Sequence, residues 1–306
     1  MDTPIVRIEN LSHRYSVQWA VRDINLEIRQ HGIYGFLGSN GAGKSTIMNI
    51  MCGVLKQTEG DIYIKGINTR IDPVEAKCHI GFLPQQPPLH PDLTVEEYLD
   101  YSARLRYIPH KEIPAAITEV VEKCGISHFR KRLIRNLSGG YQQRVGIAQA
   151  IIHNPDFIIL DEPTNGLDPN QIVEIRNLIK QIAQERTVIL STHILPEVQA
   201  TCEYIYMVEK GKMVFSGTVD EFDNYILPTT IRVTLLAHPT VEELTMIPGL
   251  VAAQHLGEMD YRLQFADARN MVDEIIETCG IHNWRLSQIY MEKSSLDVVF
   301  AELSKK

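Results

Sequence analysis

The sequence predicts an α/β fold built around a phosphate-binding loop, joined to a smaller α+β domain. Three observations lead to this prediction. First, a buried strand, a glycine-rich loop and a helix follow one another between Ile33 and Met51. Second, short apolar runs typical of buried parallel strands alternate with helical patterns up to about residue 220. Third, the elements after that point follow a different order, so we expect domains at residues 1–220 and 221–306.

The composition is that of a soluble globular protein with one large domain or two ordinary ones. The chain has 306 residues, of which 44% are apolar and 22% are charged. The formal net charge of −8 argues against a nucleic-acid-binding protein, because such proteins usually carry a basic excess. No apolar run reaches the roughly 18–20 residues that span a bilayer.

The N-terminus and the cysteines predict the compartment. Residues 1–4 contain neither a basic nor an apolar segment, so we expect no signal peptide. The five cysteines are scattered, odd in number and without a Cys-x-x-Cys pair, which favours buried free thiols in a reducing cytoplasm. They are Cys52, Cys78, Cys124, Cys202 and Cys279.

The phosphate-binding loop lies between the predicted strand 33–37 and the predicted helix 45–51. It consists of Gly38, Ser39, Asn40, Gly41, Ala42, Gly43, Lys44, Ser45 and Thr46. Glycines let the backbone approach a triphosphate closely and aim several N–H groups at it. Lys44 can then contact the β- and γ-phosphates, and the Ser45 hydroxyl can bind Mg²⁺. The helix start adds its positive dipole end to the same anion site.

Two alternating strands open the chain, at residues 5–8 and 24–28. Between them, the face of Tyr15 can stack on a nucleotide base. Trp19 is a second candidate for this role, and packing on its own sheet is the alternative for Tyr15. Further strands are expected at residues 61–64 and 80–83.

The strand at residues 80–83 is followed by a proline-rich loop, Pro84-Gln85-Gln86-Pro87-Pro88, in which a helix is excluded. Gln85 lies where the strand gives way to this loop. Its neutral amide can touch Mg²⁺ or the attacking water and can move with the loop. The alternative is that Gln85 is an ordinary loop residue.

A mainly helical insert is expected over about residues 92–150. Thr94 and Glu97 form a capping box at the start of its first helix, and apolar residues at helical spacing follow between residues 113 and 124. A second anion-binding helix start is expected at Ser138, Gly139 and Gly140. Ser138 is a favourable N-cap, and the two glycines let the backbone approach an anion, although an ordinary helix cap is the alternative.

A short apolar run at residues 157–160 predicts a central parallel strand that ends in Asp161 and Glu162. Two carboxylates at the exit of a buried strand are costly unless they have a function. Because neighbouring residues of a strand point to opposite sides, we expect two different roles. Asp161 can hold Mg²⁺, and Glu162 can accept a proton from the attacking water.

His193 follows another buried strand, at residues 187–192, at the sheet edge where ligands bind in α/β folds; a structural role is its alternative. The first domain also contains an amphipathic helix at residues 172–182 and a closing hairpin at residues 204–215. Beyond about residue 220 the order is strand, helix, strand, strand, helix, strand, which predicts a ferredoxin-like or ACT-like domain. A final helix is expected at residues 296–303.

Taken together, these residues resemble the ATP-binding subunit of an ABC transporter over about residues 4–220. The order and approximate spacing of six elements carry the resemblance. They are the Walker A loop Gly38 to Thr46, the signature Leu137-Ser138-Gly139-Gly140, the Walker B strand ending at Asp161 with Glu162 next, the Q-loop Gln85, the D-loop Asn165-Gly166-Leu167-Asp168 and the switch histidine His193; Tyr15 fits the base-stacking aromatic. The resemblance implies a P-loop NTPase fold of the ABC type, with a RecA-like core, an antiparallel β subdomain and the helical insert.

The resemblance also implies an active ATPase with ATP and Mg²⁺ as cofactors. Two such domains face each other head to tail, so that ATP on the Walker A loop of one is covered by Ser138, Gly139 and Gly140 of the other. The implied catalytic residues are Glu162, His193 and Gln85. The implied Mg²⁺ ligands are Ser45, Gln85 and Asp161. Asp168 is counted among the nucleotide-binding residues.

The implied partners are a second ATP-binding subunit, most simply in a homodimer, and a separate integral membrane permease, with no nucleic acid. The helical insert and the Gln85 loop would form the docking groove for a cytoplasmic helix of the permease. The chain would therefore be cytoplasmic and peripheral on the inner face of the cell membrane.

Within the superfamily, the chain looks most like the ABC-2-type drug-export branch, in part through its closing segment 295–303, so an exporter is expected. An importer ATPase whose C-terminal domain senses a small ligand is one alternative. A non-transport ATPase acting on DNA or ribosomes is another. It is disfavoured by the acidic charge, the single motif set and the lack of sustained heptads.

Overall fold

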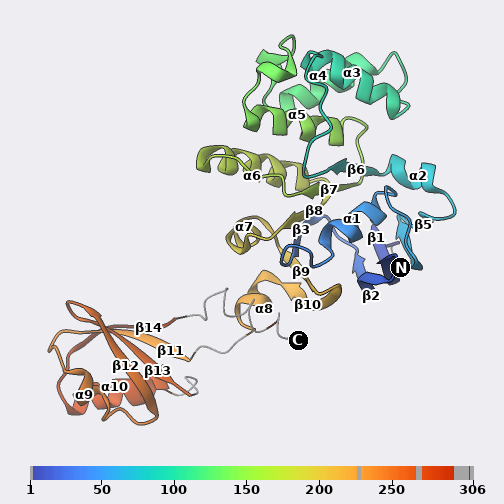
Figure 1. The fold of residues 1–306 in the computed structure, drawn as a ribbon. Helices are drawn as coiled ribbons and strands as arrows, with labels where there is room; N and C mark the ends of the chain where they lie inside the picture. The colour runs from blue at the N-terminus through green and yellow to red at the C-terminus, as the bar shows by residue number, and fades with distance from the viewer. Residues whose placement is uncertain (1–2, 226–228, 267–270, 293–302, 304–306) are drawn as a thin grey trace. The chain divides into compact units, whose positions relative to one another are not determined.

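The computed structural model describes residues 3–225, 229–266, 271–292 and Leu303 (Figure 1). The chain divides into two compact units, Met1–Val219 and Asp220–Lys306, and each has its own hydrophobic core. The first unit carries the phosphate-binding loop. In the part of the chain that the structure describes, no helix is both long and apolar enough to span a bilayer.

A four-stranded antiparallel sheet opens the first unit. Across the sheet its strands are β2 (Gln18–Ile28), β1 (Val6–Tyr15), β4 (Glu59–Ile64) and β5 (Ile67–Asn68). Val6 of β1 pairs with Ile28 of β2 on one side and with Ile64 of β4 on the other. Tyr15 is the last residue of β1, so the register of this sheet sets the position of its ring.

A six-stranded sheet forms the centre of the unit. Its strands, in order, are β10 (Lys212–Thr218), β9 (Tyr204–Glu209), β3 (Gly32–Leu37), β8 (Thr187–Thr192), β7 (Phe157–Asp161) and β6 (Ile80–Leu83). The strands from β9 to β6 run parallel, and β10 returns antiparallel to β9, which confirms the predicted hairpin. Because parallel strands end at the same edge, the loops after β3, β6, β7 and β8 meet there.

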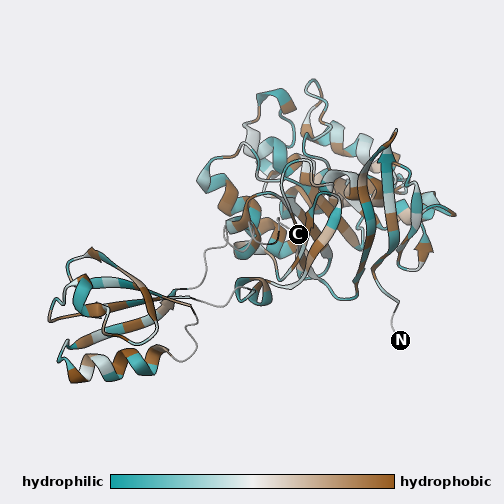
Figure 2. Ribbon diagram, turned by 60° about the horizontal axis from the view of Figure 1, so that its bottom comes forward, coloured by the Kyte–Doolittle hydropathy of each residue, from teal (hydrophilic) through white to brown (hydrophobic). Residues whose placement is uncertain are grey.

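Helices cover both faces of the central sheet. On one side, α1 (Lys44–Met51) lies between the two sheets, and its buried residues share one core with β1, β2, β4 and β7 (Figure 1). On the other side, α6 (Pro169–Ala183) and α7 (Leu195–Thr201) contact β3 and β8. The short helix α2 (Pro73–Cys78) completes the unit, and α8 (Val219–Asp223) spans the boundary between the two units. Figure 2 shows apolar residues along the strands at the centre of this unit.

The predicted helical insert is confirmed as α3 (Val95–Leu105), α4 (Ile113–Lys123) and α5 (Gly139–Ile151), with two short 3-10 turns, Ser127–Phe129 and Ile134–Asn136. The capping box is also present, because Thr94 Oγ1 accepts from the Glu97 N–H and the Glu97 carboxylate accepts from the Thr94 N–H. Ser138 is the N-cap residue of α5, as predicted, but its side chain makes no capping hydrogen bond.

In its described residues, the second unit contains a four-stranded antiparallel sheet packed with helices. Its strands, in order, are β12 (Leu250–Gly257), β13 (Asp260–Phe265), β11 (Thr230–Leu235) and β14 (Leu286–Glu292). Helix α9 (Val241–Leu244) follows β11, and α10 (Met271–Ile281) follows β13, which confirms the predicted βαββαβ order. Residues 296–302, which hold most of the predicted final helix, are outside the described residues.

The prediction that all cysteines are buried is wrong for one of them. Cys78 is exposed at the end of α2, a short helix in which Ala76 is the buried residue. The other four thiols are buried and free. Burial raises the pKa of Cys124 to about 12 and that of Cys279 to about 11, so both remain protonated near neutral pH.

Gly81, in β6, allows a close approach between the central sheet and the helical insert. A Cβ there would overlap the backbone carbonyl oxygen of Ala150 in α5, which has no side-chain freedom to move aside. Gly81→Ala should therefore lower the free energy of unfolding by about 1–3 kcal/mol, seen as a lower midpoint in urea. Gly280→Ala is the control, because a Cβ there meets nothing within 4 Å and Ala favours α10. An unchanged midpoint for Gly81→Ala would contradict this packing.

Candidate functional site

The loop after β3 is shaped by glycines with positive φ. Gly41 and Gly43 have φ values of +81° and +111°, in the region that residues with a side chain adopt only under strain. Gly43 is the N-cap of α1, and its carbonyl accepts from the N–H of Ile47 at 3.0 Å. The unpaired N–H groups of the first helical turn are therefore presented together with the loop.

Lys44 places a buried ammonium group at the centre of this loop. Its Nζ donates to the carbonyl oxygens of Gly38, at 2.7 Å, and Ser39, at 3.0 Å. Burial lowers the pKa of Lys44, while the charges of Glu162, Asp161 and Glu209 act in the opposite direction. The lysine is thus held in place by its own loop and lies within the field of three carboxylates.

The Ser39 hydroxyl anchors the loop to the central sheet. It donates to the carboxylate of Glu209, at the end of β9, with distances of 3.0 and 2.8 Å to the two oxygens. The two residues are 170 positions apart in the chain. Nothing local in the sequence indicates this contact, and sequence reasoning did not identify Glu209.

A cavity of about 550 Å³ opens above the ends of the parallel strands. This volume is in the range of small-molecule sites. Its lining comes from β1 and β2, from the loop after β3 and the start of α1, and from the loops after β6, β7 and β8. The lining residues are Tyr15, Ala20, Asn40, Gly41, Gly43, Lys44, Ser45, Thr46, Gln85, Glu162, Asn165 and His193.

Glu162 lies at the centre of a hydrogen-bonded cluster in this cavity. Its Oε1 lies 2.9 Å from His193 Nδ1, and its Oε2 accepts from Gln85 Nε2 at 2.9 Å and from Asn165 Nδ2 at 3.4 Å. The Glu162 side chain is 12% exposed. Two of its partners are neutral amides, which orient the carboxylate without neutralising it. A carboxylate held in this way can accept a proton from a molecule in the cavity.

The backbone of Glu162 corrects one part of the sequence reasoning. Strand β7 ends at Asp161, and Glu162 has φ +47°, which is uncommon for a residue with a side chain. Its N–H donates to the carbonyl of Ser191 at 3.0 Å. Glu162 is therefore directed by a left-handed turn, and the argument from alternation along a strand does not apply to it. Strained backbone of this kind is typical of functional sites.

Asp161 is buried beside the loop and does not itself line the cavity. Burial raises the pKa of Asp161, and the charge of Glu162 raises it further, while the neighbouring Ser191 and Ser45 side chains and the charge of Lys44 lower it. Ser45 and Asp161 are therefore neighbours at the loop, and both carry oxygen atoms of the kind that bind Mg²⁺. Within the described ranges, no group of three or more His, Cys, Asp or Glu side chains forms a complete metal site.

The two aromatic candidates differ in their surroundings. Tyr15 lines the cavity and is 52% exposed, with its ring edge against His13 at 4.8 Å between centroids. Trp19 does not line the cavity; instead the guanidinium groups of Arg14 and Arg22 lie over its ring, at 5.7 and 4.8 Å. Of the two, Tyr15 is the one with a free surface toward the site.

Asn165 is a cavity residue to which sequence reasoning gave no role beyond the D-loop pattern. Its amide contacts Glu162, and its N–H donates to the Glu162 carbonyl at 3.1 Å in a tight turn. The spacing of three residues from a carboxylate, in a turn-rich segment, is the signal that could have identified it.

Seven predicted nucleotide-binding residues do not line this cavity. Gly38, Ser39 and Ala42 are three of them, and they belong to the phosphate-binding loop itself. The other four lie elsewhere in the unit. Ser138, Gly139 and Gly140 lie at the start of α5, where Gly140 borders a separate small cavity next to α6. Asp168 is the N-cap of α6 and accepts from the N–H of Gln171 at 2.9 Å. One chain therefore brings together the phosphate-binding loop and the Glu162 cluster, but not the segment 138–140.

Comparison with known proteins gives a consistent result. The family model described as ABC transporter matches residues 21–165. The chain is 40% identical over 212 residues to the bacitracin transport ATP-binding protein BcrA of Bacillus licheniformis, covering 69% of this chain and 68% of that protein. It is 28% identical over 305 residues to the linearmycin resistance ATP-binding protein LnrL of Bacillus subtilis (strain 168), covering 98% of each.

A solved structure agrees with this family match. It is the dimeric post-hydrolysis state of the ATP-binding cassette MJ0796 bound to ADP and Pi, which has a TM-score of 0.64 and 29% identity. The similarity covers 70% of this chain and 98% of that one. The predicted P-loop fold of the ABC type is therefore confirmed.

Proposed function

We propose that this chain, which belongs to the family of ABC transporter ATP-binding proteins, hydrolyses ATP in the cavity around Glu162 and thereby drives a separate membrane permease. Family membership establishes ATP binding and hydrolysis. The observation that carries the proposal is that the phosphate-binding loop and the hydrogen-bonded Glu162 cluster line one cavity.

In this proposal the triphosphate lies on the loop from Gly38 to Thr46. The loop N–H groups and the N-terminus of α1 bind the phosphate oxygens. Lys44 exchanges its two loop carbonyls for the β- and γ-phosphates. The adenine base stacks on the exposed face of Tyr15. The attraction between Lys44 and the triphosphate thereby offsets the free-energy cost of burying the lysine.

Glu162 then accepts a proton from the water that attacks the γ-phosphate. Gln85 and Asn165 hold its Oε2, so that the carboxylate faces the cavity in one orientation. His193 contacts Oε1 through Nδ1, which leaves Nε2 available to the γ-phosphate. The neutral amide of Gln85 can also touch the water or the metal as its proline-rich loop moves.

The oxygen ligands around the loop fit Mg²⁺. Ser45 and Asp161 both carry oxygen atoms at the loop, and burial is the main cause that raises the pKa of Asp161. Mg²⁺ in ATPase sites is typically held by one or two carboxylates together with the phosphates, so no larger protein cluster is needed. We assign Ser45, Asp161 and Gln85 as its ligands. The ion would neutralise charge on the β- and γ-phosphates.

The site would be completed by a second copy of the chain. Ser138, Gly139, Gly140 and Asp168 do not line the cavity of their own chain, which supports a role across a dimer interface. The similar MJ0796 structure is dimeric. Because a shared site needs two chains, ATP hydrolysis per chain should rise with protein concentration before it levels off. A rate per chain that stays constant on dilution, in chains that sediment as monomers, would contradict the shared site.

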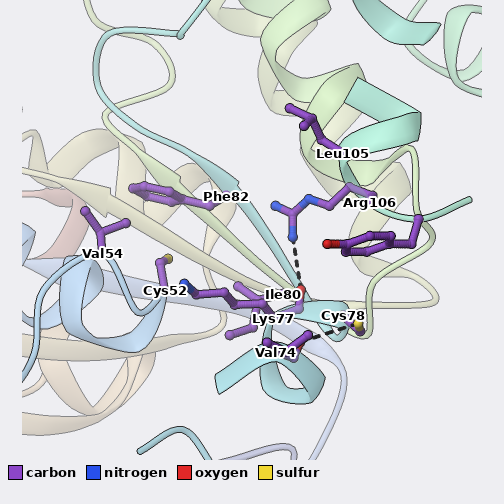
Figure 3. Close-up of a pocket in the computed structure, with 10 residues that line it drawn as sticks. Cys52, Val54, Val74, Lys77, Cys78, Ile80, Phe82, Leu105 and Arg106 are labelled. Carbon is purple, nitrogen blue, oxygen red and sulfur yellow. Dashed lines mark hydrogen bonds between the residues drawn. The ribbon is translucent and has the colours of Figure 1, made fainter. Parts of the chain in front are cut away.

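We propose that a second cavity, drawn in Figure 3, is the docking surface for the permease. It measures about 380 Å³ and lies between the end of α1, α2, β6 and the end of α3. Its lining is mainly apolar, with Lys77 and Arg106 as the cations: Cys52, Val54, Val74, Lys77, Cys78, Ile80, Phe82, Leu105, Arg106 and Tyr107. Leu105 and Tyr107 are 60% and 84% exposed. We propose that a cytoplasmic permease helix docks here, beside β6, the strand that leads into the Gln85 loop, which places the chain peripherally at the inner face of the membrane.

Leu105→Glu should abolish co-purification of the membrane partner while nucleotide binding stays unchanged. The substitution puts a charge into the apolar wall of the docking cavity, far in the chain from the phosphate-binding loop. The measurement is a pull-down from detergent-solubilised membranes, with nucleotide affinity measured in parallel. Val251→Glu, an equally exposed apolar residue in the second unit, is the control. Undiminished recovery of the partner with Leu105→Glu would place the docking surface elsewhere.

We propose export as the direction of transport. The support is that one relative is named for bacitracin transport and another for linearmycin resistance. Resistance to a toxic compound fits its removal from the cell. The closing segment 295–303, which resembles that of drug-export ATPases, points the same way.

A further inference from the structure

Glu197 is a buried carboxylate that the proposed hydrolysis does not use. It lies in the first turn of α7 and is 6% exposed. The Thr164 hydroxyl lies 2.7 Å from its Oε1 and 2.8 Å from its Oε2, and the Thr192 hydroxyl donates to Oε2 at 3.1 Å. Both threonines are buried as well. Among the described side chains, the hydrogen-bond partners of Glu197 are thus hydroxyls rather than cations.

The two threonines belong to the two segments that carry the catalytic cluster. Thr164 is two residues after Glu162 and directly precedes Asn165, which contacts the Glu162 carboxylate. Thr192 ends β8 and directly precedes His193, which contacts the same carboxylate from the other side. The Thr192 hydroxyl also accepts from the N–H of Ile194 at 3.0 Å, which fixes the turn that contains His193.

A carboxylate removed from water is costly unless donors are aimed at it, and hydrogen bonds to an ionised acceptor are stronger than neutral ones. Any movement of Thr164 away from Thr192 would leave Glu197 short of a donor. Glu197 therefore links the segment that contains Glu162 and Thr164 to the segment that contains Thr192 and His193.

We propose that Glu197 is a positioning residue for ATP hydrolysis. By binding Thr164 and Thr192, it fixes the backbone on either side of Glu162 and His193 and so maintains the 2.9 Å contact between those two side chains. Glu197 itself touches neither nucleotide nor water. The inference rests on the proposed roles of Glu162 and His193.

Glu197→Ala in the full chain should lower kcat about ten- to a hundredfold, because small displacements of catalytic groups have effects of this order. The KM for ATP and the affinity for a fluorescent nucleotide should change less than about twofold, since the phosphate-binding loop is untouched. Glu197→Gln keeps the shape and one oxygen acceptor and should restore part of the lost kcat. A kcat for Glu197→Ala within twofold of the unmodified chain, or a loss that appears only as fewer nucleotide-binding molecules, would overturn the proposal.

A second set of variants keeps the test informative if Glu197→Ala folds poorly. Thr164→Val and Thr192→Val each remove one hydroxyl and keep the branched shape. Each should lower kcat with KM unchanged. The double variant Thr164→Val with Glu197→Gln should lose little more than the more impaired single variant, because both act through one contact. Fully additive losses would show that Glu197 does not act through Thr164.

Glu162→Gln, measured in parallel, separates this inference from the function on which it rests. Normal turnover in Glu162→Gln would overturn the role of Glu162 itself. Normal kcat in Glu197→Ala, together with an inactive Glu162→Gln, would overturn only the positioning role of Glu197.

Discussion

Glu162→Gln should bind ATP as tightly as the unmodified chain and hydrolyse it about 10²–10⁴ times more slowly. The amide has the same shape as the carboxylate, and its oxygen can still accept from one of the neighbours that hold Glu162. It cannot take a proton from water. The measurements are steady-state phosphate release and the binding of a fluorescent ATP analogue.

The same variant should accumulate as an ATP-bound dimer, because the step that opens the shared site is removed. Sedimentation with and without ATP would show a mass of two chains only when ATP is present. Glu119→Gln, an exposed residue of α4, is the matched control and should behave as the unmodified chain. Near-normal phosphate release by Glu162→Gln would falsify the general-base assignment.

Lys44→Ala should weaken ATP binding by roughly 10- to 150-fold, which corresponds to the loss of about 1.5–3 kcal/mol from a charged hydrogen bond. The lysine is buried at the loop, and its positive charge interacts with the negative charges of Glu162, Asp161 and Glu209. Without it, the γ-phosphate meets three carboxylates and no local cation from the loop. Titration with a fluorescent nucleotide measures the effect directly.

Lys56→Ala is the control for this experiment, since Lys56 is exposed and does not line the cavity. Its nucleotide affinity should stay within twofold of that of the unmodified chain. Unchanged nucleotide affinity in Lys44→Ala would remove Lys44 from the phosphate site and leave the loop backbone as the main anion binder.

Much of the fold and of the candidate site could be predicted because their signals are local. The glycine spacing around Lys44 and the apolar runs before Glu162 and His193 each describe one loop or strand. Parallel pairing then brings the ends of those strands to one edge, and Gln85, Glu162 and His193 line one cavity there. The βαββαβ order of the second unit was likewise readable from short patterns.

The features that sequence reasoning missed depend on contacts between distant segments or on backbone geometry. The Ser39–Glu209 contact joins residues 170 positions apart, and no pattern near either residue indicates it. Glu162 has a positive φ and hydrogen-bonds to Ser191 on the neighbouring strand, and neither feature follows from a local pattern. Ser138 has the residue type of a cap, but its hydroxyl is not used as one. Residue type alone does not determine which of several partners a side chain binds.

We expect that ATP hydrolysis by this chain drives a separate membrane protein. The most direct test is to purify the tagged chain from detergent-solubilised membranes of its native cell and to measure ATP hydrolysis with and without the co-purified proteins. We predict an integral membrane partner whose presence raises the hydrolysis rate of the unmodified chain but not that of Glu162→Gln. Recovery of soluble proteins, DNA or ribosomes alone would contradict the transport function while leaving the ATPase chemistry in place.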